Sequence, residues 1–412
     1  MNISRNCGVG DAAYIPAHSS SVGAIAPGRG LFSIGKEKVM PFVVEKKVLF
    51  DMLKKTIGII QTKSSLQILS NLKLSLSPET IETTTTDLDN YIKVSGEIKG
   101  DGEVELAVNA RKLFEVVREL SEGPLTLSVD ENVITIESGD SFVCKIAGMD
   151  ANEFPQFPDI SDKKQIDVSL SALNDMIRKT TFAVAKDDAR PALAGVLWEI
   201  NADKTGMVAT EGHKLGSCFY AGEFNVDSKI RSIVPPKSLL HLASMFSQEQ
   251  QDKKVSVSFG GKHVLFNYEG VSLCTKLIDC KYPDCDNVIP KNNPKKAVIE
   301  KNILQEAVRR VSVLSNQKTH LAKFIFRKNE LEIMAANNDV CGEARQRIPI
   351  IYDGEEHIIG FNTQFLLEII GIVSSQKIRM EMSTKTSACL ILPECKTESD
   401  DLFLLMPLKI IE

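Results

Sequence analysis

Three segments of the chain repeat one helical pattern at nearly equal spacing. Residues 44–56 (VEKKVLFDMLKKT) return as residues 168–180 (VSLSALNDMIRKT) and again as residues 299–311 (IEKNILQEAVRRV). Each copy has apolar residues at helical spacing and a basic pair near its end, which predicts an amphipathic helix. The similar offsets between the copies divide most of the chain into units of nearly equal length. The sequence therefore predicts three copies of one domain.

A second helical segment recurs in each copy, in residues 108–117, 234–243 and 360–369. When these segments are aligned, Leu113, Leu239 and Phe365 occupy equivalent positions. A residue in a position to cap a helix stands near the start of each one: Asn109, Pro235 and Asn362. Between the helices lie alternating or β-branched runs that predict strands, in residues 71–77, 195–200 and 324–327. Each copy thus predicts an α+β domain, with antiparallel sheets and two helices on one face of them.

Aromatic–proline pairs mark the junctions between the copies. Phe154-Pro155 and Tyr282-Pro283 lie about one repeat length apart, and proline stiffens such a connection. The expected domains are residues 40–164, 165–293 and 294–412. Residues 1–39 are rich in Gly, Ala and Ser and lack sustained periodicity, so we expect a disordered extension. A transit-like role for this extension is the less favoured alternative.

Composition and motifs disfavour an enzyme. No apolar run approaches the roughly 18 residues of a membrane span. The 9 cysteines are scattered without a CxxC pair, which is typical of a reduced, cytoplasmic protein without a metal site. Residues 30–37 have the GxxxxGK frame of a phosphate loop, but Glu37 stands where a hydroxyl is needed. Glu211 and His213 could suggest acid–base catalysis, yet a strand-end turn around Gly212 is the favoured interpretation. We expect no catalytic residue, no metal and no cofactor.

The charge distribution points to a polyanionic partner. The net charge is −5, while the six helical segments together carry +6 and the remainder −11. Cations near helix ends complement the helix dipole, which explains their place along each helix. It does not explain why the acidic surplus is confined to strands and loops. One basic helical face on an acidic protein predicts contact with nucleic acid. Because aromatic residues make up only 6%, phosphate contacts with a duplex are favoured over base stacking.

Short motifs in a fixed order then indicate a family: TDLD (86–89), ARK (110–112), EFP (153–155), RPAL (190–193), VATEGHKL (208–215), YPD (282–284), LSN (314–316), GFN (360–362) and MPL (406–408). From about Met40 to Ile410 the chain resembles the bacterial sliding clamps, the β subunits of DNA polymerase III. This resemblance implies a head-to-tail homodimeric ring of six clamp domains, with helices lining the hole and sheets outside. Such a ring slides on double-stranded DNA without reading its sequence, and it confers processivity without catalysis.

The resemblance also implies site residues. The DNA-facing positions are Lys63, Arg111, Lys186, Arg190 and Lys237. A pocket for short linear motifs matches Leu193, Thr210, Gly212, His213, Lys214, Leu215, Pro283, Val288, Leu404, Met406, Pro407 and Leu408. Its implied partners are the DNA polymerase III catalytic subunit, the clamp loader, other polymerases and repair proteins. Ring closure is expected at Cys144 and Ile146 on an edge strand and at Val313 and Leu314 on the facing helix.

Departures from the family pattern limit this expectation. Pro191, Ala192 and Pro236 stand where some relatives carry aromatic or basic residues, so DNA contact is in doubt there. Two rival hypotheses remain. One is a binding module that uses the same pocket without forming a ring. The other is an enzyme centred on Glu211 and His213.

Overall fold

The computed structural model describes residues 41–60, 66–139, 141–160, 164–186, 189–246, 253–337, 341–395 and 397–410. The chain divides into a unit of residues 1–39 and a compact unit of residues 40–412. The predicted extension, including the phosphate-loop frame at residues 30–37, lies outside the described residues.

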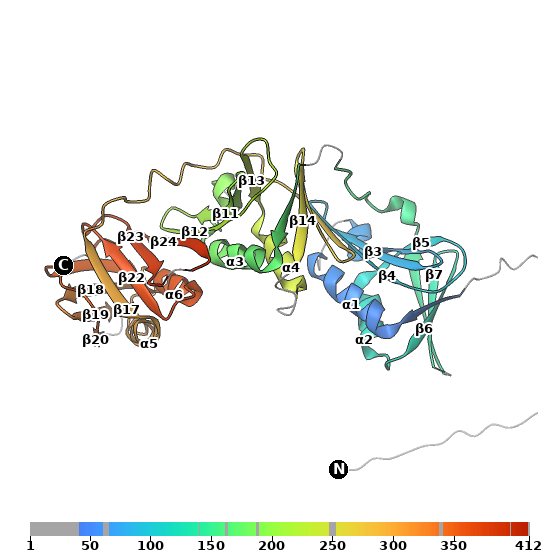
Figure 1. Cartoon of the computed structure of the whole chain (residues 1–412). Helices are drawn as coiled ribbons and strands as arrows, with labels where there is room; N and C mark the ends of the chain where they lie inside the picture. Colours follow the sequence, from blue (N-terminus) through green and yellow to red (C-terminus); the bar gives the residue numbers. More distant parts are fainter. Residues whose placement is uncertain are drawn as a thin grey trace, which may run out of the picture. The chain divides into compact units, whose positions relative to one another are not determined.

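Three stretches of the compact unit repeat one order of elements (Figure 1). The first stretch contains β1 (Phe42–Glu45), α1 (Lys46–Thr56), β2 (Asn71–Leu76), β3 (Thr80–Thr86), β4 (Asn90–Glu97), β5 (Val104–Asn109), α2 (Ala110–Glu119), β6 (Pro124–Asp130), β7 (Val133–Ser138) and β8 (Phe142–Met149). The second contains β9 (Lys164–Ser169), α3 (Leu170–Thr180), β10 (Val196–Ile200), β11 (Lys204–Thr210), β12 (Lys214–Ala221), β13 (Ile230–Val234), α4 (Pro236–Met245), β14 (Lys254–Gly260), β15 (His263–Tyr268) and β16 (Val271–Lys276).

The third stretch contains β17 (Lys295–Glu300), α5 (Lys301–Ser312), β18 (Leu321–Arg327), β19 (Glu330–Asn337), β20 (Gly342–Pro349), β21 (His357–Asn362), α6 (Thr363–Ile372), β22 (Lys377–Met382), β23 (Cys389–Pro393) and β24 (Ser399–Leu405). Every stretch is a strand, a helix and three strands, followed by the same five elements again. Each domain is therefore itself a duplication, and the described chain holds six half-domains of one pattern.

Helices α2, α4 and α6 begin directly after the predicted cap positions Asn109, Pro235 and Asn362. Asn109 accepts a hydrogen bond from the backbone N–H of Lys112 at 3.0 Å and caps α2. Asn362 caps α6 in the same way. Capping satisfies a backbone donor that the first turn of a helix leaves free. One predicted alignment is wrong, because the fully buried residue of α6 that matches Leu113 and Leu239 is Leu366 and not Phe365.

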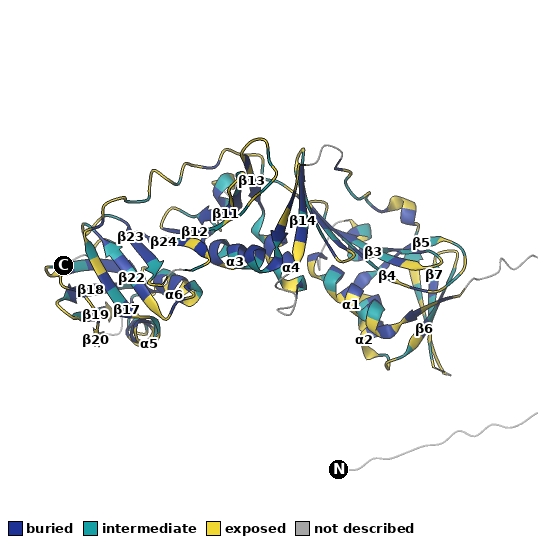
Figure 2. Cartoon of the chain, viewed as in Figure 1, coloured by how far each residue is buried: buried dark blue, intermediate teal, exposed yellow. Residues whose placement is uncertain are grey.

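The two helices of each domain contact each other and pack on strands of their own domain. In α1, for example, Leu49, Met52 and Leu53 are buried while Lys47 and Lys54 are exposed. Figure 2 shows buried and exposed sides along α1, whereas α3 is mostly buried or half-buried. Burial of one apolar stripe per helix against a sheet is the main stabilising term for such a domain.

The sheets run across the domain boundaries. β4 of the first domain pairs with β16 of the second, from Asn90 opposite Thr275 to Val94 opposite Val271. β12 of the second domain pairs with β24 of the third, from Lys214 opposite Leu405 to Tyr220 opposite Ser399. All strand pairings among the described residues are antiparallel, which confirms the predicted α+β class. We call these two interdomain pairings the first seam and the second seam.

Among the described strands that end a half-domain, two keep an open edge. β20 pairs only with β19 in its four-stranded sheet. β8 pairs fully with β7 but with β5 only at Gly148 and Met149. An unpaired strand edge presents backbone N–H and C=O groups that can join another chain.

Candidate functional sites

The TEGHKL segment forms the turn between β11 and β12. Gly212 has φ of 101°, a conformation that glycine adopts without steric cost. The Thr210 hydroxyl accepts from the Gly212 N–H at 3.0 Å and donates to the Lys214 carbonyl at 2.8 Å. Tyr282 adds a hydroxyl that accepts from the Thr210 N–H at 3.1 Å. The favoured interpretation of this segment as a strand-end turn is confirmed.

Successive side chains of β12 point to opposite faces of the sheet. Leu215 lies on the face that carries Leu404 and Met406, where it is 1% exposed. Lys214 points the other way and forms an ion pair with Glu368 of α6. Its ammonium lies 4.5 Å from the centre of the Phe365 ring. The side chain of Lys214 therefore stabilises the second seam and does not line the predicted pocket.

Most of the other predicted pocket residues gather at one end of the second seam. Leu215 stands directly opposite Leu404, and the Met406 N–H donates to the His213 carbonyl at 2.7 Å. Leu193, Leu215 and Leu404 are buried, whereas Val288 is 57% exposed. The remaining predicted residues are half-exposed or exposed: Thr210, Gly212, His213, Pro283, Met406, Pro407 and Leu408. Leu408 does not belong to the apolar cluster of Leu215. It forms an isolated antiparallel β-bridge with Gly360 of β21.

The structure adds Cys285 to this group. Cys285 packs against both the apolar cluster of Leu193 and the apolar cluster of Leu215, so it joins them. Burial raises the pKa of its thiol to about 11, so at neutral pH it is a small apolar group. No motif in the sequence marks this residue. We call the surface formed by Leu193, Leu215, Cys285, Val288, Leu404 and Met406 the junction site.

Arg190 also belongs beside the junction site. Its guanidinium donates to the Glu211 carbonyl at 2.8 Å and lies over Gly212, where an added Cβ would come within 3.3 Å of it. Arg190 thus supports the β11–β12 turn. The resemblance implies a DNA-facing role for Arg190, whereas the contact that the structure shows is with the turn.

The other predicted DNA-facing residues lie in varied settings. Arg111 is exposed in the first turn of α2, and Lys186 is exposed after α3; neither has an ion pair among the described residues. Lys237 of α4 pairs with Asp87 across the first seam at 2.6 Å. Lys63 lies outside the described residues. The site prediction omitted the exposed cations of α1 and α5 that form no ion pair with a described residue, which are Lys47, Lys54 and Arg309; Arg310 is also exposed but pairs with Glu306.

One cation of the predicted basic pairs is not available to a ligand. Lys179 is 2% exposed and pairs with Asp175 of its own helix and with Asp401 of β24, the latter at 2.7 Å. It also donates to the Ser399 hydroxyl at 2.9 Å. This buried group links the second and third domains.

The predicted closure residues lie at the free edges and beside them. Cys144 and Ile146 are half-buried on β8 and pack against the core of the first domain. Val313 caps the C-terminal end of α5 and is 78% exposed, and Leu314 follows it half-buried.

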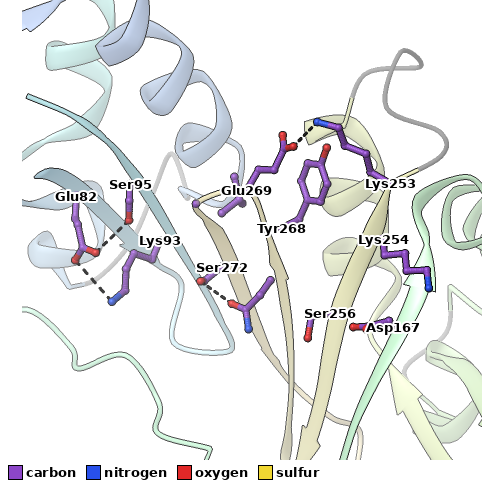
Figure 3. A pocket seen from close by; sticks show the side chains of 13 residues that line it. Glu82, Lys93, Ser95, Asp167, Lys253, Lys254, Ser256, Tyr268, Glu269 and Ser272 are labelled. Atoms are coloured by element: carbon purple, nitrogen blue, oxygen red, sulfur yellow. Dashed lines mark hydrogen bonds and ion pairs between the residues drawn. The ribbon is translucent and has the colours of Figure 1, made fainter. Parts of the chain in front are cut away.

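A polar hollow of about 610 Å³ lies at the first seam (Figure 3). Directly opposed residues cross it from strand to strand: Lys93, Ser272, Asn267, Ser256 and Asp167. Four of its charges are neutralised in the pairs Lys93–Glu82 and Lys253–Glu269.

Within the described part of the chain, no three His, Cys, Asp or Glu residues are grouped to hold a metal. No described helix is both long and apolar enough to cross a membrane.

Family models for the DNA polymerase III beta subunit match in sequence order. The N-terminal domain model covers residues 40–158, the central domain model residues 167–284, and the C-terminal domain model residues 286–407. The chain belongs to the DNA polymerase III beta-subunit family. The family comprises the beta sliding clamps, which are non-catalytic processivity factors. The enzyme hypothesis for Glu211 and His213 is therefore set aside.

Similar proteins span almost the whole chain. The beta sliding clamp of Pseudomonas putida is 28% identical over 373 residues, which are 90% of this chain and 100% of that protein. The beta sliding clamp of Escherichia coli is 27% identical with the same coverage. A sliding clamp structure from Pseudomonas aeruginosa, bound to griselimycin, superposes with a TM-score of 0.86 at 27% identity; the match covers 90% of this chain and 100% of that one.

Proposed function

We propose that two copies of this chain close head to tail into a ring around double-stranded DNA, where the ring tethers the replicative polymerase. The pairing of half-domains carries this proposal. At both seams the last strand of a first half-domain, β4 or β12, pairs with the last strand of the next domain's second half, β16 or β24. The corresponding strands without such a partner are β20 and β8. Among the strands that end a half-domain, these are the two open edges.

Pairing of β20 with β8 of a second chain repeats the seam for a third time. With this pairing, two chains together contain six equivalent seams. No strand that ends a half-domain then remains without a partner strand. Such an interface is heterologous, because two different surfaces meet, and it closes only if the rotation per domain completes a circle. The exposed Val313 at the end of α5 and the half-buried Cys144 and Ile146 on β8 support this pairing.

The intrachain seams also predict the register at closure. Asn90 and Lys214 each stand four residues after the end of the preceding strand, and Asn90 pairs with Thr275. The equivalent position before β20 is Cys341. Thr275 lies eight residues before Pro283 of its aromatic–proline pair. Ala147 lies eight residues before Pro155, the equivalent proline of the first domain. Cys341 of one chain is thus expected opposite Ala147 of the other.

The exposed helix cations support contact with a duplex. Arg111, Lys47, Lys54 and Arg309 project from helices and make no ion pair with another described residue. Phosphate contacts from such groups are independent of sequence, so they permit sliding. Lys237 contributes less freely, because Asp87 already neutralises it. Enclosure then supplies processivity without tight binding.

The junction site supports binding of short linear motifs. It combines aliphatic side chains, Met406 and a neutral thiol on a surface between two domains, and such surfaces suit adaptable peptide recognition. We propose that it receives segments of the DNA polymerase III catalytic subunit, the clamp loader, other polymerases and repair proteins. Domain boundaries at residues 40–164, 165–293 and 294–412 and a cytoplasmic location complete the proposal. The described cysteines, which form no disulfide with one another, support that location.

Retention on circular DNA tests the ring. After loading, the protein should stay on a nicked circular duplex through a high-salt wash and leave the same duplex once it is cut to a linear form. Only topological linkage predicts this difference, since phosphate contacts are screened equally on both substrates. Equal loss from both substrates, together with a monomer at micromolar concentration by light scattering, would favour the module without a ring.

A further inference from the structure

The junction site is one end of a longer apolar strip on the sheet. The apolar cluster that contains Leu215 and Leu404 continues through half-exposed side chains along the second seam: Leu402, Leu392 and Phe219. The strip crosses β12 and β24, which lie side by side although they belong to different domains (Figure 1). Leu404 stands opposite Leu215, and Leu402 stands opposite Ser217 two residues further on.

The strip ends in a second hollow. This hollow has a volume of about 530 Å³ and is lined by residues of both domains, among them Lys204, Phe219, Arg379, Leu392 and Asp400. Phe219 stands four residues after Leu215 on the same face of β12. At about 3.3 Å per residue the two side chains are separated by roughly 13 Å. An extended peptide covers that distance in about four residues.

The aromatic side chain of the second hollow is held in place. An added Cβ at Gly206 would approach the Phe219 ring to 2.1 Å, so the ring lies directly over this glycine on the neighbouring strand. The Lys204 ammonium lies 5.0 Å from the centre of the ring. The ring is half-exposed, so one part of it is open to a ligand.

The charges around the hollow favour a cationic group. Asp203, Glu398 and Asp400 are exposed and form no ion pair with any described residue. Arg379, the guanidinium in the lining, is neutralised by Glu381 and Glu394. Lys204 is the one cation of the lining that lacks a carboxylate partner in the described chain. Among the described residues of this rim, carboxylates outnumber free cations, so the rim attracts a basic side chain.

We propose that the junction site and the second hollow together form one docking surface for an extended peptide with two anchors. An aliphatic or aromatic anchor occupies the junction site. A basic residue, about four positions away, places its apolar stem against Phe219 and its charge among Asp203, Glu398 and Asp400. This inference rests on the proposed peptide-binding role of the junction site and assigns a second contact to the same partners.

Panning a phage-displayed library of random peptides, each long enough to span both anchors, against the full chain tests the proposal. The enriched peptides should share an apolar cluster and a Lys or Arg about four residues from it. Enrichment of the apolar cluster without a basic residue at that spacing would refute the second anchor. The proposed peptide-binding role of the junction site would still be supported. If no apolar cluster is enriched, or if Leu404→Asp leaves capture unchanged, the proposed peptide-binding role itself fails.

Synthetic peptides provide the second measurement. By fluorescence anisotropy, an enriched peptide should bind about tenfold more tightly than the same peptide cut back to its apolar cluster. Phe219→Ala or Asp400→Lys should remove this gain and leave the affinity of the truncated peptide unchanged. Asp400→Lys alters an exposed side chain, so it keeps the test decisive if Phe219→Ala fails to fold. Asp353→Lys, at an exposed site away from the strip, is the matched control. Full retention of the gain in both variants would refute the second anchor.

Discussion

The Lys214 ammonium pairs with the Glu368 carboxylate across the second seam, between the rings of Phe182 and Phe365. This lysine belongs to the most specific motif of the chain, yet its side chain serves the contact between two domains. The neighbouring Leu215 serves the opposite face. One strand therefore fixes the relative position of two domains and presents a binding surface at the same time.

Loss of the Lys214 charge should weaken the second seam. Lys214→Met keeps most of the apolar stem but leaves Glu368 without its partner, so we expect a loss of about 1–2 kcal/mol in the free energy of unfolding. The loss is limited because Glu368 is 44% exposed and water can solvate it. Thermal unfolding should show a lower transition temperature for Lys214→Met than for Lys47→Met, which alters an exposed lysine. Equal transition temperatures would contradict this role.

The buried Lys179 group should give a larger effect with a defined pH dependence. Burial disfavours the charge on Lys179, but hydrogen bonds to Asp175 and Asp401 outweigh this effect and raise its pKa. Burial likewise disfavours the charge on Asp175, yet hydrogen bonds from Lys179, Arg178 and Tyr220 lower its pKa. Both shifts mean that the native state holds the two charged forms more strongly than the unfolded chain does.

Lys179→Met should therefore cost about 3–5 kcal/mol near neutral pH, because it leaves the buried Asp401 carboxylate without its cation and removes one of the two cations that pair with the half-buried Asp175. The contribution of Asp175 is present above its ordinary pKa of 3.8 and is lost as the pH falls through its lower native value. The contribution of Lys179 is present below its ordinary pKa of 10.5 and is lost as the pH rises through its higher native value. Denaturant unfolding at several pH values should show a constant difference between wild type and variant from about pH 5 to 9, and a smaller one outside. A difference that peaks at either extreme would argue against the ionic pairing.

A disulfide across the free edges should capture the closed ring. Three residues along from Cys341 and Ala147, the proposed register places Ala344 of one chain opposite Cys144 of the other. Both side chains are half-buried and pack against the core of their own domain, so they share one face of the sheet. Mild oxidation of Ala344→Cys should give a covalent dimer on a non-reducing gel. Glu343→Cys, on the opposite face, should not, and adding Cys144→Ser to Ala344→Cys should abolish the product. A covalent dimer from Glu343→Cys alone would show a different register.

Charge reversal should separate the DNA surface from the junction site. Arg111→Glu removes an exposed phosphate partner, so it should weaken DNA association and reduce the slope of log K against log salt by about 1. Arg190→Glu should leave that slope unchanged, because Arg190 supports the turn at Glu211, and should weaken peptide binding instead. Titration of a labelled duplex at several salt concentrations measures the first effect, and peptide anisotropy measures the second. A changed slope in Arg190→Glu would return this residue to the DNA surface.

The repeat of helical segments was sufficient to predict three α+β domains, because the apolar stripe of each helix is visible in residue spacing. The half-domain duplication was missed, although the two halves of each copy share the expected order of a helix followed by strands. Phe365 was placed one position too early because the interval from Pro235 to Asn362 is one residue longer than the interval from Asn109 to Pro235. Spacing alone cannot detect such a one-residue shift when both candidate residues are apolar.

The sequence could not predict the direction in which the side chains of the sites point. Lys179 and Arg178 are adjacent in a basic pair, yet Lys179 is buried by β24, a strand of the next domain. Cys285 entered the junction site because two apolar clusters meet at its thiol, which depends on tertiary packing. Both cases require contacts between distant segments, and local patterns carry no information about these.

The two open edges of the chain are different strands, and this difference gives any closed assembly a direction. In the proposed ring β20 always meets β8, so both chains run the same way around the DNA. Their junction sites, and the second hollows beside them, then open toward the same side of the ring. A partner held there is always on the same face of the ring, so the orientation in which the ring is placed on the DNA determines which end of a primer the tethered enzyme faces.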